Sequence, residues 1–469
     1  MSTKTIYGIQ VSAANQPELD PEFISMTAFT AAFEKSAANG RPVVIALERE
    51  NGQVARYETK IHGTPDFHEA DRVYIERTLK MLIWAAGGFK VFIGGDDAVQ
   101  EIGKEIAAVY KKGGEREFDA DFMARVYENK FEVVVLPFDK APKEVSRPKK
   151  IGGNEKGCRI GFDAGGSDRK VSAVVDGEAV YDEEVLWLPK ENTDPDYHYN
   201  EILTAFRTAA AKLPRVDAIG VSSAGIYVGN RAMVASLFIK VPLDLFDKKV
   251  KNIYIRAAAE ISKEVGHDLP LVVVNDGDVT ALAGAMTIGD NEVLGIAMGT
   301  SEAVGYVNHD GNITGWLNEL SFAPIDIGAD KAFDDWSGDK GTGNKYFSQD
   351  AVIRLAEKQG IKFTSDQTLA KRLKQVQGLC EEGDPTAEAV FRTIGCYLAH
   401  ALAYYTKFYQ IRHILLLGRV MSGKGGDILL DVAGKVLKEE YPEVNKQISI
   451  DLPDEKFRRL GQSVVAASL

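Results

Sequence analysis

Cysteine is scarce in this sequence, and long apolar segments are missing. The 469 residues include three cysteines, an odd number without CxxC spacing, which disfavours both a disulfide framework and a zinc site. No run of about 18 apolar residues occurs, so we expect no transmembrane helix. The first residues, MSTKT, lack the apolar core of a signal peptide. These absences predict a cytoplasmic protein with reduced thiols and no membrane partner.

An excess of positive charge is also missing. The formal net charge of −12 argues against a nucleic-acid-binding surface over the whole chain, so we expect no nucleic-acid partner. The remaining composition, 45% hydrophobic and 26% charged, is typical of a globular protein. A chain of this length exceeds one ordinary core, which predicts two or three domains.

Residues 1–141 predict a separate α/β domain of unknown role. Apolar runs predict strands, two of them joined by a hairpin turn at Asn51-Gly52, and residues 68–86 have helical periodicity. Acidic and basic residues are nearly balanced in number here, which argues against a DNA-binding head. The Lys- and Pro-bearing residues 142–157 then predict a linker.

The rest of the chain repeats one α/β plan twice. Each half opens with a strand that breaks at small residues and then resumes, and helices and further strands follow. This pattern predicts two lobes, residues 158–288 and 289–469, that face one another across a ligand cleft.

The first lobe opens with a predicted β-hairpin. Its first strand ends in Asp163, and its tip consists of Gly165, Gly166 and Ser167. Because glycine has no Cβ, such a tip exposes backbone N–H groups that suit a phosphate, and Asp163 could hold the accompanying metal. An ordinary surface hairpin explains this segment equally well on its own.

The second lobe opens with a similar break at Gly299, Thr300 and Ser301. Because the two tips occupy equivalent places in a duplicated chain, we expect them to bind a triphosphate through N–H donors and hydroxyl groups. The later stretch GRVMSGKG, starting at Gly418, lacks the Ser or Thr of a Walker A motif, which disfavours a P-loop enzyme. It fits better as a turn beside which an adenine could lie.

Polar side chains follow several predicted strands. Asn275 and Asp276 end an apolar strand, where a carboxylate could take the proton of a hydroxyl that attacks a γ-phosphate. The alternative is a helix N-cap, for which Asn and Asp are common. Glu319 and Ser223 also lie at strand ends and could hydrogen-bond a polyol, although any loop carries similar residues.

Several stretches together resemble the ROK family of sugar kinases and sugar-responsive repressors, within the hexokinase, Hsp70 and actin ATPase superfamily. They are IGFDAGGS at 160–167, IGVSSAG at 219–225, VNDGDVTAL at 274–282, GTS at 299–301 with Gly305, and LLG at 416–418. GWLNEL at 315–320 is similar to the family's stretch with a sugar-binding Glu, and LGQSVVAA at 460–467 to its closing helix. The resemblance covers about residues 158–469.

The resemblance implies duplicated actin-like (ribonuclease H-like) α/β lobes, ATP and Mg²⁺ as cofactors, and a sugar substrate. The roles that it implies are Asp276 as general base, Asn275 and Glu319 on the sugar, Asp163 near magnesium, Gly165, Gly166, Gly299 and Thr300 on the phosphates, and Gly418 near adenosine. The resemblance is compatible with a homodimer but does not decide the oligomeric state.

The chain departs from the ROK pattern Glu-x-Gly-His after Glu319, because Ser321 and Phe322 stand where the family has Gly and His, and the zinc-binding cysteine cluster is missing. No structural zinc is expected, and the identity of the sugar stays open. We predict ATP-dependent phosphorylation of a hydroxyl of a hexose-like sugar. The alternatives are a non-catalytic ROK-type sugar sensor or regulator, and a superfamily ATPase that acts on a protein partner.

Overall fold

The computed structural model describes residues 2–147, 151–453 and 461–469. The chain forms two compact units that interleave along the sequence. Unit 1 comprises Met1–Arg147, Ile296–Val304 and Trp316–Asp451, and unit 2 comprises Pro148–Gly295, Gly305–Gly315 and Leu452–Leu469. Residues 148–150 of the predicted linker and residue 460 of the last motif lie outside the described residues.

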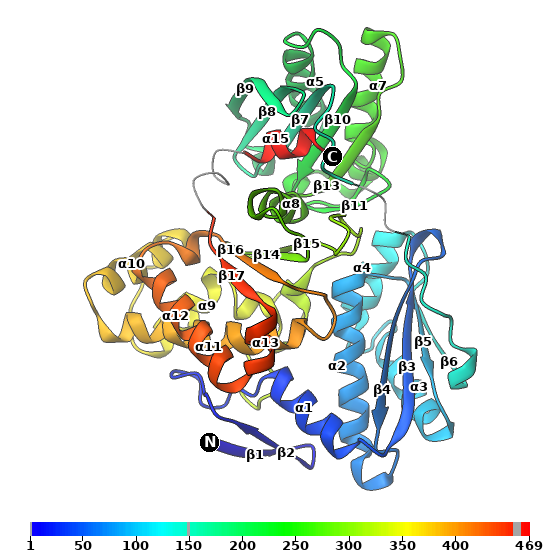
Figure 1. Cartoon of the computed structure of the whole chain (residues 1–469), viewed down its shortest axis with the longest axis vertical. Helices are drawn as coiled ribbons and strands as arrows, with labels where there is room; N and C mark the ends of the chain where they lie inside the picture. The colour runs from blue at the N-terminus through cyan, green and yellow to red at the C-terminus, as the bar shows by residue number, and fades with distance from the viewer. Residues whose placement is uncertain (1, 148–150, 454–460) are drawn as a thin grey trace. The chain divides into compact units, whose positions relative to one another are not determined.

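The first 147 residues of unit 1 contain a four-stranded sheet in the order β4-β3-β5-β6 (Figure 1). Its strands are β3 (Arg41–Glu48), β4 (Val54–Ile61), β5 (Lys90–Gly94) and β6 (Glu132–Leu136). The accompanying elements are the hairpin β1 (Ser2–Ile6) and β2 (Ile9–Ala13) and the helices α1 (Met26–Ser36), α2 (His68–Ala86), α3 (Asp97–Val109) and α4 (Glu117–Tyr127). Asn51 and Gly52 both have positive φ between the antiparallel strands β3 and β4, so the predicted hairpin turn is confirmed.

A second four-stranded sheet has the order β15-β14-β16-β17. Its strands are β14 (Val293–Met298), β15 (Glu302–Val307), β16 (His413–Leu417) and β17 (Ser449–Asp451). The helices of this part of unit 1 are α9 (Gln349–Lys358), α10 (Leu369–Glu381), α11 (Pro385–Tyr405), α12 (Lys424–Glu440) and α13 (Pro442–Gln447). In α11, Gly395 lets the helix approach α12 closely, because a Cβ there would lie 2.4 Å from the Leu429 carbonyl oxygen.

Unit 2 is built on a five-stranded mixed sheet in the order β13-β10-β7-β8-β9. Its strands are β7 (Cys158–Ala164), β8 (Asp168–Val175), β9 (Glu178–Leu186), β10 (Ala218–Ser223) and β13 (Leu271–Asn275). Strand β10 runs parallel to both β7 and β13, whereas β7, β8 and β9 are antiparallel. The main helices are α5 (Pro195–Ala210), α7 (Ile253–Val265), α8 (Asp276–Ile288) and α15 (Gln462–Ala467).

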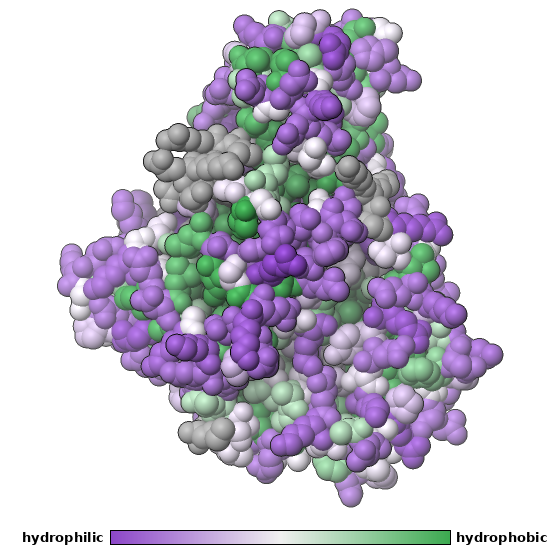
Figure 2. Space-filling view, in the orientation of Figure 1, coloured by the Kyte–Doolittle hydropathy of each residue, from purple (hydrophilic) through white to green (hydrophobic). Residues whose placement is uncertain are grey.

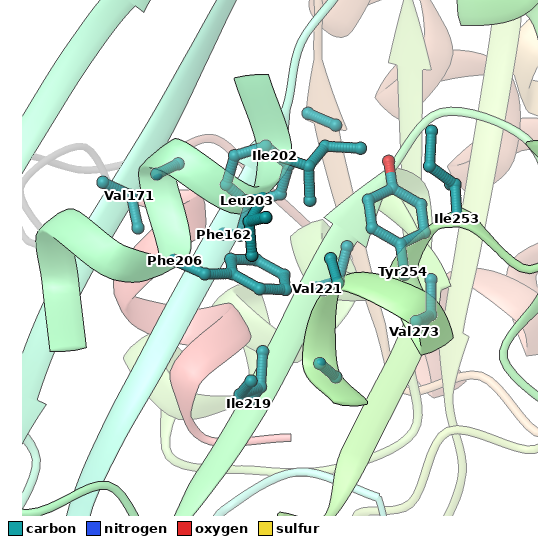
Figure 3. Packing of buried hydrophobic residues seen from close by; sticks show 14 of the residues in the cluster. Phe162, Val171, Ile202, Leu203, Phe206, Ile219, Val221, Ile253, Tyr254 and Val273 are labelled. Carbon is teal, nitrogen blue, oxygen red and sulfur yellow. The ribbon is translucent and has the colours of Figure 1, made fainter. Parts of the chain in front are cut away.

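One face of this sheet packs against α5 and α7 in an apolar core. Phe162 of β7 and Val221 of β10 lie among side chains of both helices (Figure 3). The Phe162 ring meets the rings of Phe206 in α5 and Tyr254 in α7 at centroid distances of 5.5 and 6.3 Å. Burial of these large rings accounts for the apolar alternation of the strands.

The opposite face of the sheet receives the C-terminal helix α15 (Figure 1). Gly161 and Gly220 are paired in register, and a Cβ on them would lie 1.8 Å from Ser463 O and 1.7 Å from Ala466 O. Two adjacent glycines therefore let the helix rest on the bare sheet backbone. The C-terminal helix thus packs within unit 2.

We expect Gly161→Ala to lower the free energy of unfolding by at least about 2 kcal/mol, because the added methyl group must displace helix backbone. Gly434→Ala is the matched control, since a Cβ at this position of α12 meets nothing within 4 Å. The control should gain about 0.5–1 kcal/mol from its helix propensity. Urea unfolding followed by circular dichroism measures both, and equal stabilities would contradict the close packing.

A buried ionic cluster joins the N-terminal residues to the rest of unit 1. The Asp339 carboxylate accepts contacts from Arg77 at 3.0 Å, Lys80 at 3.0 Å and Arg116 at 2.9 Å. Burial opposes ionisation of Asp339, but the three cations outweigh it and hold its pKa well below the usual range. The charged carboxylate is therefore an integral part of this packing.

Asp339→Asn should destabilise unit 1 by about 3–5 kcal/mol, because the buried Arg77 and Lys80 and the largely buried Arg116 lose their shared anion. Asp335→Asn is the control on the same segment, since its side chain is 85% exposed and lies 3.6 Å from Lys345. The control should change stability by less than about 0.5 kcal/mol. Thermal unfolding of both variants decides the matter, and similar melting temperatures would refute the role of Asp339.

Hydrophilic residues cover most of the face drawn in Figure 2. Among the described residues, no helix combines the length and the apolar character needed to cross a membrane.

Candidate functional site

The predicted metal ligand Asp163 and the predicted base Asp276 lie at the carboxyl ends of parallel strands of unit 2. Asp163 of β7 is in register with Ser222 of β10, and the Ser222 hydroxyl donates to the Asp163 carboxylate at 2.9 Å. Strand β13 ends on the far side of β10 and leads directly into Asp276, the first residue of α8. The shared sheet edge therefore brings the predicted metal ligand and the predicted base into one part of unit 2.

Burial dominates the electrostatics of this edge. It raises the pKa of Asp163 to about 6, the Ser222 hydroxyl opposes the shift, and the negative charge of Asp276 adds to it. Burial also raises the pKa of Asp276, against the lowering effects of the Gly277 N–H and of the Lys190 charge. The two carboxylates therefore lie within electrostatic range of one another, and burial disfavours the charged form of each.

The sequence left two roles open for Asn275 and Asp276, a catalytic carboxylate and a helix N-cap. The Asn275 side chain caps α8, since its Oδ1 accepts from Gly277 N at 2.7 Å and its Nδ2 donates to the Gly225 carbonyl at 2.8 Å. The helix-cap alternative therefore describes Asn275. The Asp276 carboxylate lies in the first turn, where the helix dipole stabilises negative charge. Asp278 is buried and accepts from the backbone N–H of Tyr306 at 3.2 Å, so it anchors the helix to β15.

The glycine hairpin joins β7 to β8. Gly166 and Ser167 are exposed at its tip. Gly165 requires glycine, because a Cβ would lie 2.6 Å from the Asp168 carbonyl oxygen. The Gly165 carbonyl accepts from the indole N–H of Trp187 at 2.9 Å, which holds the tip from the side of β9.

Ser223 lies on the other side of the sheet from Asp163. Its neighbour Ser222 faces Asp163, and alternation turns Ser223 toward α7. There its hydroxyl lies 2.8 Å from the Tyr254 hydroxyl and accepts from the Tyr227 hydroxyl at 2.6 Å. The side chain is fully buried, so its polar group is used inside unit 2.

Unit 1 holds the second predicted phosphate tip and the predicted adenosine residue side by side. Gly418 follows β16, adopts φ +95°, and touches the backbone just before Gly299, because a Cβ would lie 2.3 Å from Met298 O. Thr300 and Ser301 are exposed after β14. The two turns are 119 positions apart in the sequence. They lie together because β14 and β16 are neighbouring strands of the sheet.

Glu319 is held by the N-terminal part of the chain. Its backbone N–H donates to the Trp84 carbonyl at 2.9 Å, and that of Asn318 donates to the Ala85 carbonyl at 3.0 Å. Both carbonyls belong to the last turn of α2, where helix carbonyls have no partner within the helix. The predicted sugar-binding segment therefore depends on residues of the first 147 for its position.

Glu302 is an ionisable residue that the sequence patterns did not single out. It follows the tip at 299–301, is 3% exposed, and neither of its carboxylate oxygens has a hydrogen-bond partner among the described residues. Burial, and then the charge of Glu319, raise the pKa of Glu302 to about 8, which the nearby Tyr405 hydroxyl only partly offsets. The one signal in the sequence is an acidic residue opening the apolar strand EAVGYV.

Glu302→Gln should remove a pH dependence of stability. The raised pKa means that the contribution of Glu302 to stability is fully present below about pH 4.5, and up to about 1.4 kcal/mol of it is lost per pH unit as the pH rises toward 8. The variant should match wild type near pH 5 and exceed it at pH 8, whereas Glu357→Gln, a 52% exposed control, should follow wild type. Urea unfolding at both pH values tests this, and parallel pH profiles for wild type and Glu302→Gln would contradict it.

No family model matches the chain, and no curated protein does. Among solved structures, a ROK hexokinase from Thermus thermophilus superposes with a TM-score of 0.51 at 17% identity, covering 66% of this chain and 97% of that one. Two thirds of the chain has the ROK hexokinase fold. This confirms the resemblance, and the actin-like ATPase fold that it implies, at the level of the fold.

Two further structures match with lower TM-scores. One is a ROK family transcriptional regulator, a homolog of the E. coli MLC protein, at 18% identity and a TM-score of 0.49, covering 67% of this chain and 79% of that one. The other is a ROK family glucokinase from Streptomyces griseus in complex with glucose and AMPPNP, at 19% identity and a TM-score of 0.45, covering 66% and 98%.

Proposed function

We propose that the protein is a ROK-type kinase that transfers a phosphoryl group from ATP to a hydroxyl of a hexose-like sugar, with Mg²⁺, in the cytoplasm. The observation that carries the proposal is the desolvated pair Asp163 and Asp276 beside the glycine hairpin of unit 2. A purely structural sheet edge has no need of the buried Asp163 and the half-buried Asp276, because their like charges repel one another.

The residues present fit the nucleotide and its cation. The exposed tip at Gly166 and Ser167 can approach phosphate oxygens with backbone N–H groups, and Asp163 offers a hard oxygen ligand for Mg²⁺. No group of three or more His, Cys, Asp or Glu side chains suited to a metal occurs in the described part of the chain, and Mg²⁺ is usually held by one or two carboxylates with phosphates. Mg-ATP would supply the transferable phosphoryl group.

In this proposal the side chains of unit 2 act on the acceptor. Asp276 removes the proton from the attacking hydroxyl at a carboxylate oxygen, and its raised pKa makes it a better base than an ordinary carboxylate. The Asn275 side-chain amide donates one hydrogen to the Gly225 carbonyl. In this proposal its second amide hydrogen donates to a sugar hydroxyl.

The residues of unit 1 complete the proposal. Gly299, Thr300 and Ser301 contact phosphates, Gly418 lies beside adenosine, and Glu319 accepts from a sugar hydroxyl. The adjacency of Gly418 to the backbone before Gly299 supports this assignment, because one nucleotide can then meet both turns.

Release of ADP across a panel of hexoses, amino sugars and polyols tests the function. Wild type should turn over with at least one sugar, and Asp276→Asn should lower kcat by about 10²–10⁴-fold, because the base is lost. Asp244→Asn is the control, since this side chain of unit 2 is 67% exposed and pairs only loosely with Lys248 at 3.7 Å.

Each of the other outcomes would contradict part of the proposed function. Sugar binding by wild type without turnover would replace the kinase by a sugar sensor. ADP release that no sugar stimulates would replace it by an ATPase acting on another partner, and equal rates for wild type and Asp276→Asn would remove Asp276 as the base.

A further inference from the structure

The segment after β9 is braced against the glycine hairpin. The backbone N–H groups of Trp187 and Leu188 both donate to the Ser167 carbonyl at 3.1 Å. The Trp187 indole binds Gly165, and the Tyr197 hydroxyl donates to the Trp187 carbonyl. Three of these hydrogen bonds tie the segment to the tip that the proposed function assigns to phosphates, and the fourth ties it to α5.

The backbone of this segment is held in an uncommon conformation. Leu188 has φ +46° and ψ +57°, a left-handed geometry that is unfavourable for a residue with a Cβ and persists only where contacts enforce it. Pro189 follows, and its carbonyl oxygen lies 2.9 Å from Nε2 of the fully buried His198. The turn therefore fixes the backbone position of the next residue, Lys190.

Lys190 lies over the tip of the hairpin. A Cβ built on Gly166 would lie 3.5 Å from both Cε and Nζ of Lys190. The positive charge of Lys190 also acts on Asp276. It lowers the pKa of Asp276 and so opposes the larger raising effect of burial. Among the described residues Lys190 makes no ion pair, whereas the adjacent Glu191 pairs with Lys240 at 2.9 Å.

The hairpin brings one cation near Asp163, since the Lys170 charge lowers the pKa of Asp163, but the Lys170 ammonium group also lies 3.9 Å from Glu184. Asp163 and Asp276 are both acidic, and the hairpin tip offers only backbone dipoles from Gly166 and Ser167. A nucleotide triphosphate would add further negative charge, of which Mg²⁺ neutralises only part. An ammonium group next to the tip would offset the remainder.

We propose that the Lys190 ammonium group binds the terminal phosphate oxygens of the nucleotide at the Gly165-Gly166 hairpin. This assignment rests on the proposed function and names a residue that none of the sequence motifs contains. Lys190 is a phosphate-binding residue in this arrangement, and its neighbour Lys240, already paired with Glu191, has no such role.

Isothermal titration of wild type, Lys190→Ala, Lys190→Arg and Lys240→Ala with Mg-ATP and with adenosine tests the assignment. Lys190→Ala should weaken Mg-ATP binding by at least about tenfold and leave adenosine binding unchanged, since only the phosphates lose a partner. Lys190→Arg should keep most of the affinity, because it retains the charge. Lys240→Ala should bind Mg-ATP like wild type.

The failures are distinguishable. If wild type does not bind Mg-ATP, the proposed kinase function fails and the Lys190 assignment with it. If wild type binds but Lys190→Ala binds equally well, or loses Mg-ATP and adenosine affinity alike, the Lys190 assignment alone is overturned. Thermal unfolding of Lys190→Ala should equal that of wild type, because the side chain is exposed, and this excludes loss of folding as the cause.

Discussion

Side-chain alternation along β7 and β10 is the constraint on which unit 2 depends. Phe162 and Val221 point into the core with α5 and α7, so Gly161 and Gly220 must present the other face. On that face, α15 packs directly on the backbone of the two glycines. Asp163, two residues after Gly161 in β7, points to the same face. The same period that builds the core therefore determines on which side the acidic edge lies.

The N-terminal residues take part in the architecture of unit 1. The cluster around Asp339 joins α2 and the start of α4 to the segment after Glu319, and the last turn of α2 receives the backbone of Asn318 and Glu319. Residues 1–147 and 316–451 consequently belong to one compact unit. The N-terminal residues thus support the segment with the predicted sugar ligand.

Local patterns were sufficient for much of the fold. The turn at Asn51-Gly52 and the helix beginning after Asn275 follow from neighbouring residues, and the structure has both; the strand through Asp163 is also present and ends one residue later, at Ala164. Domain boundaries are not local properties, and those predicted from the sequence stay predictions. The placement of the C-terminal helix against β7 and β10 depends on packing between residues about 250 to 300 positions apart, which no pattern in the helix itself records.

By itself, the sequence determined the order of the motifs, the glycine-broken hairpins and the positions of Asp163 and Asp276 at strand ends, because turn chemistry and side-chain period act over a few residues. Only the tertiary structure decided their environments. The raised pKa of Asp163, the unpartnered carboxylate of Glu302 and the approach of Lys190 to Gly166 all arise from desolvation and proximity between distant segments. Such effects depend on which surfaces pack together, and that is settled by the fold as a whole.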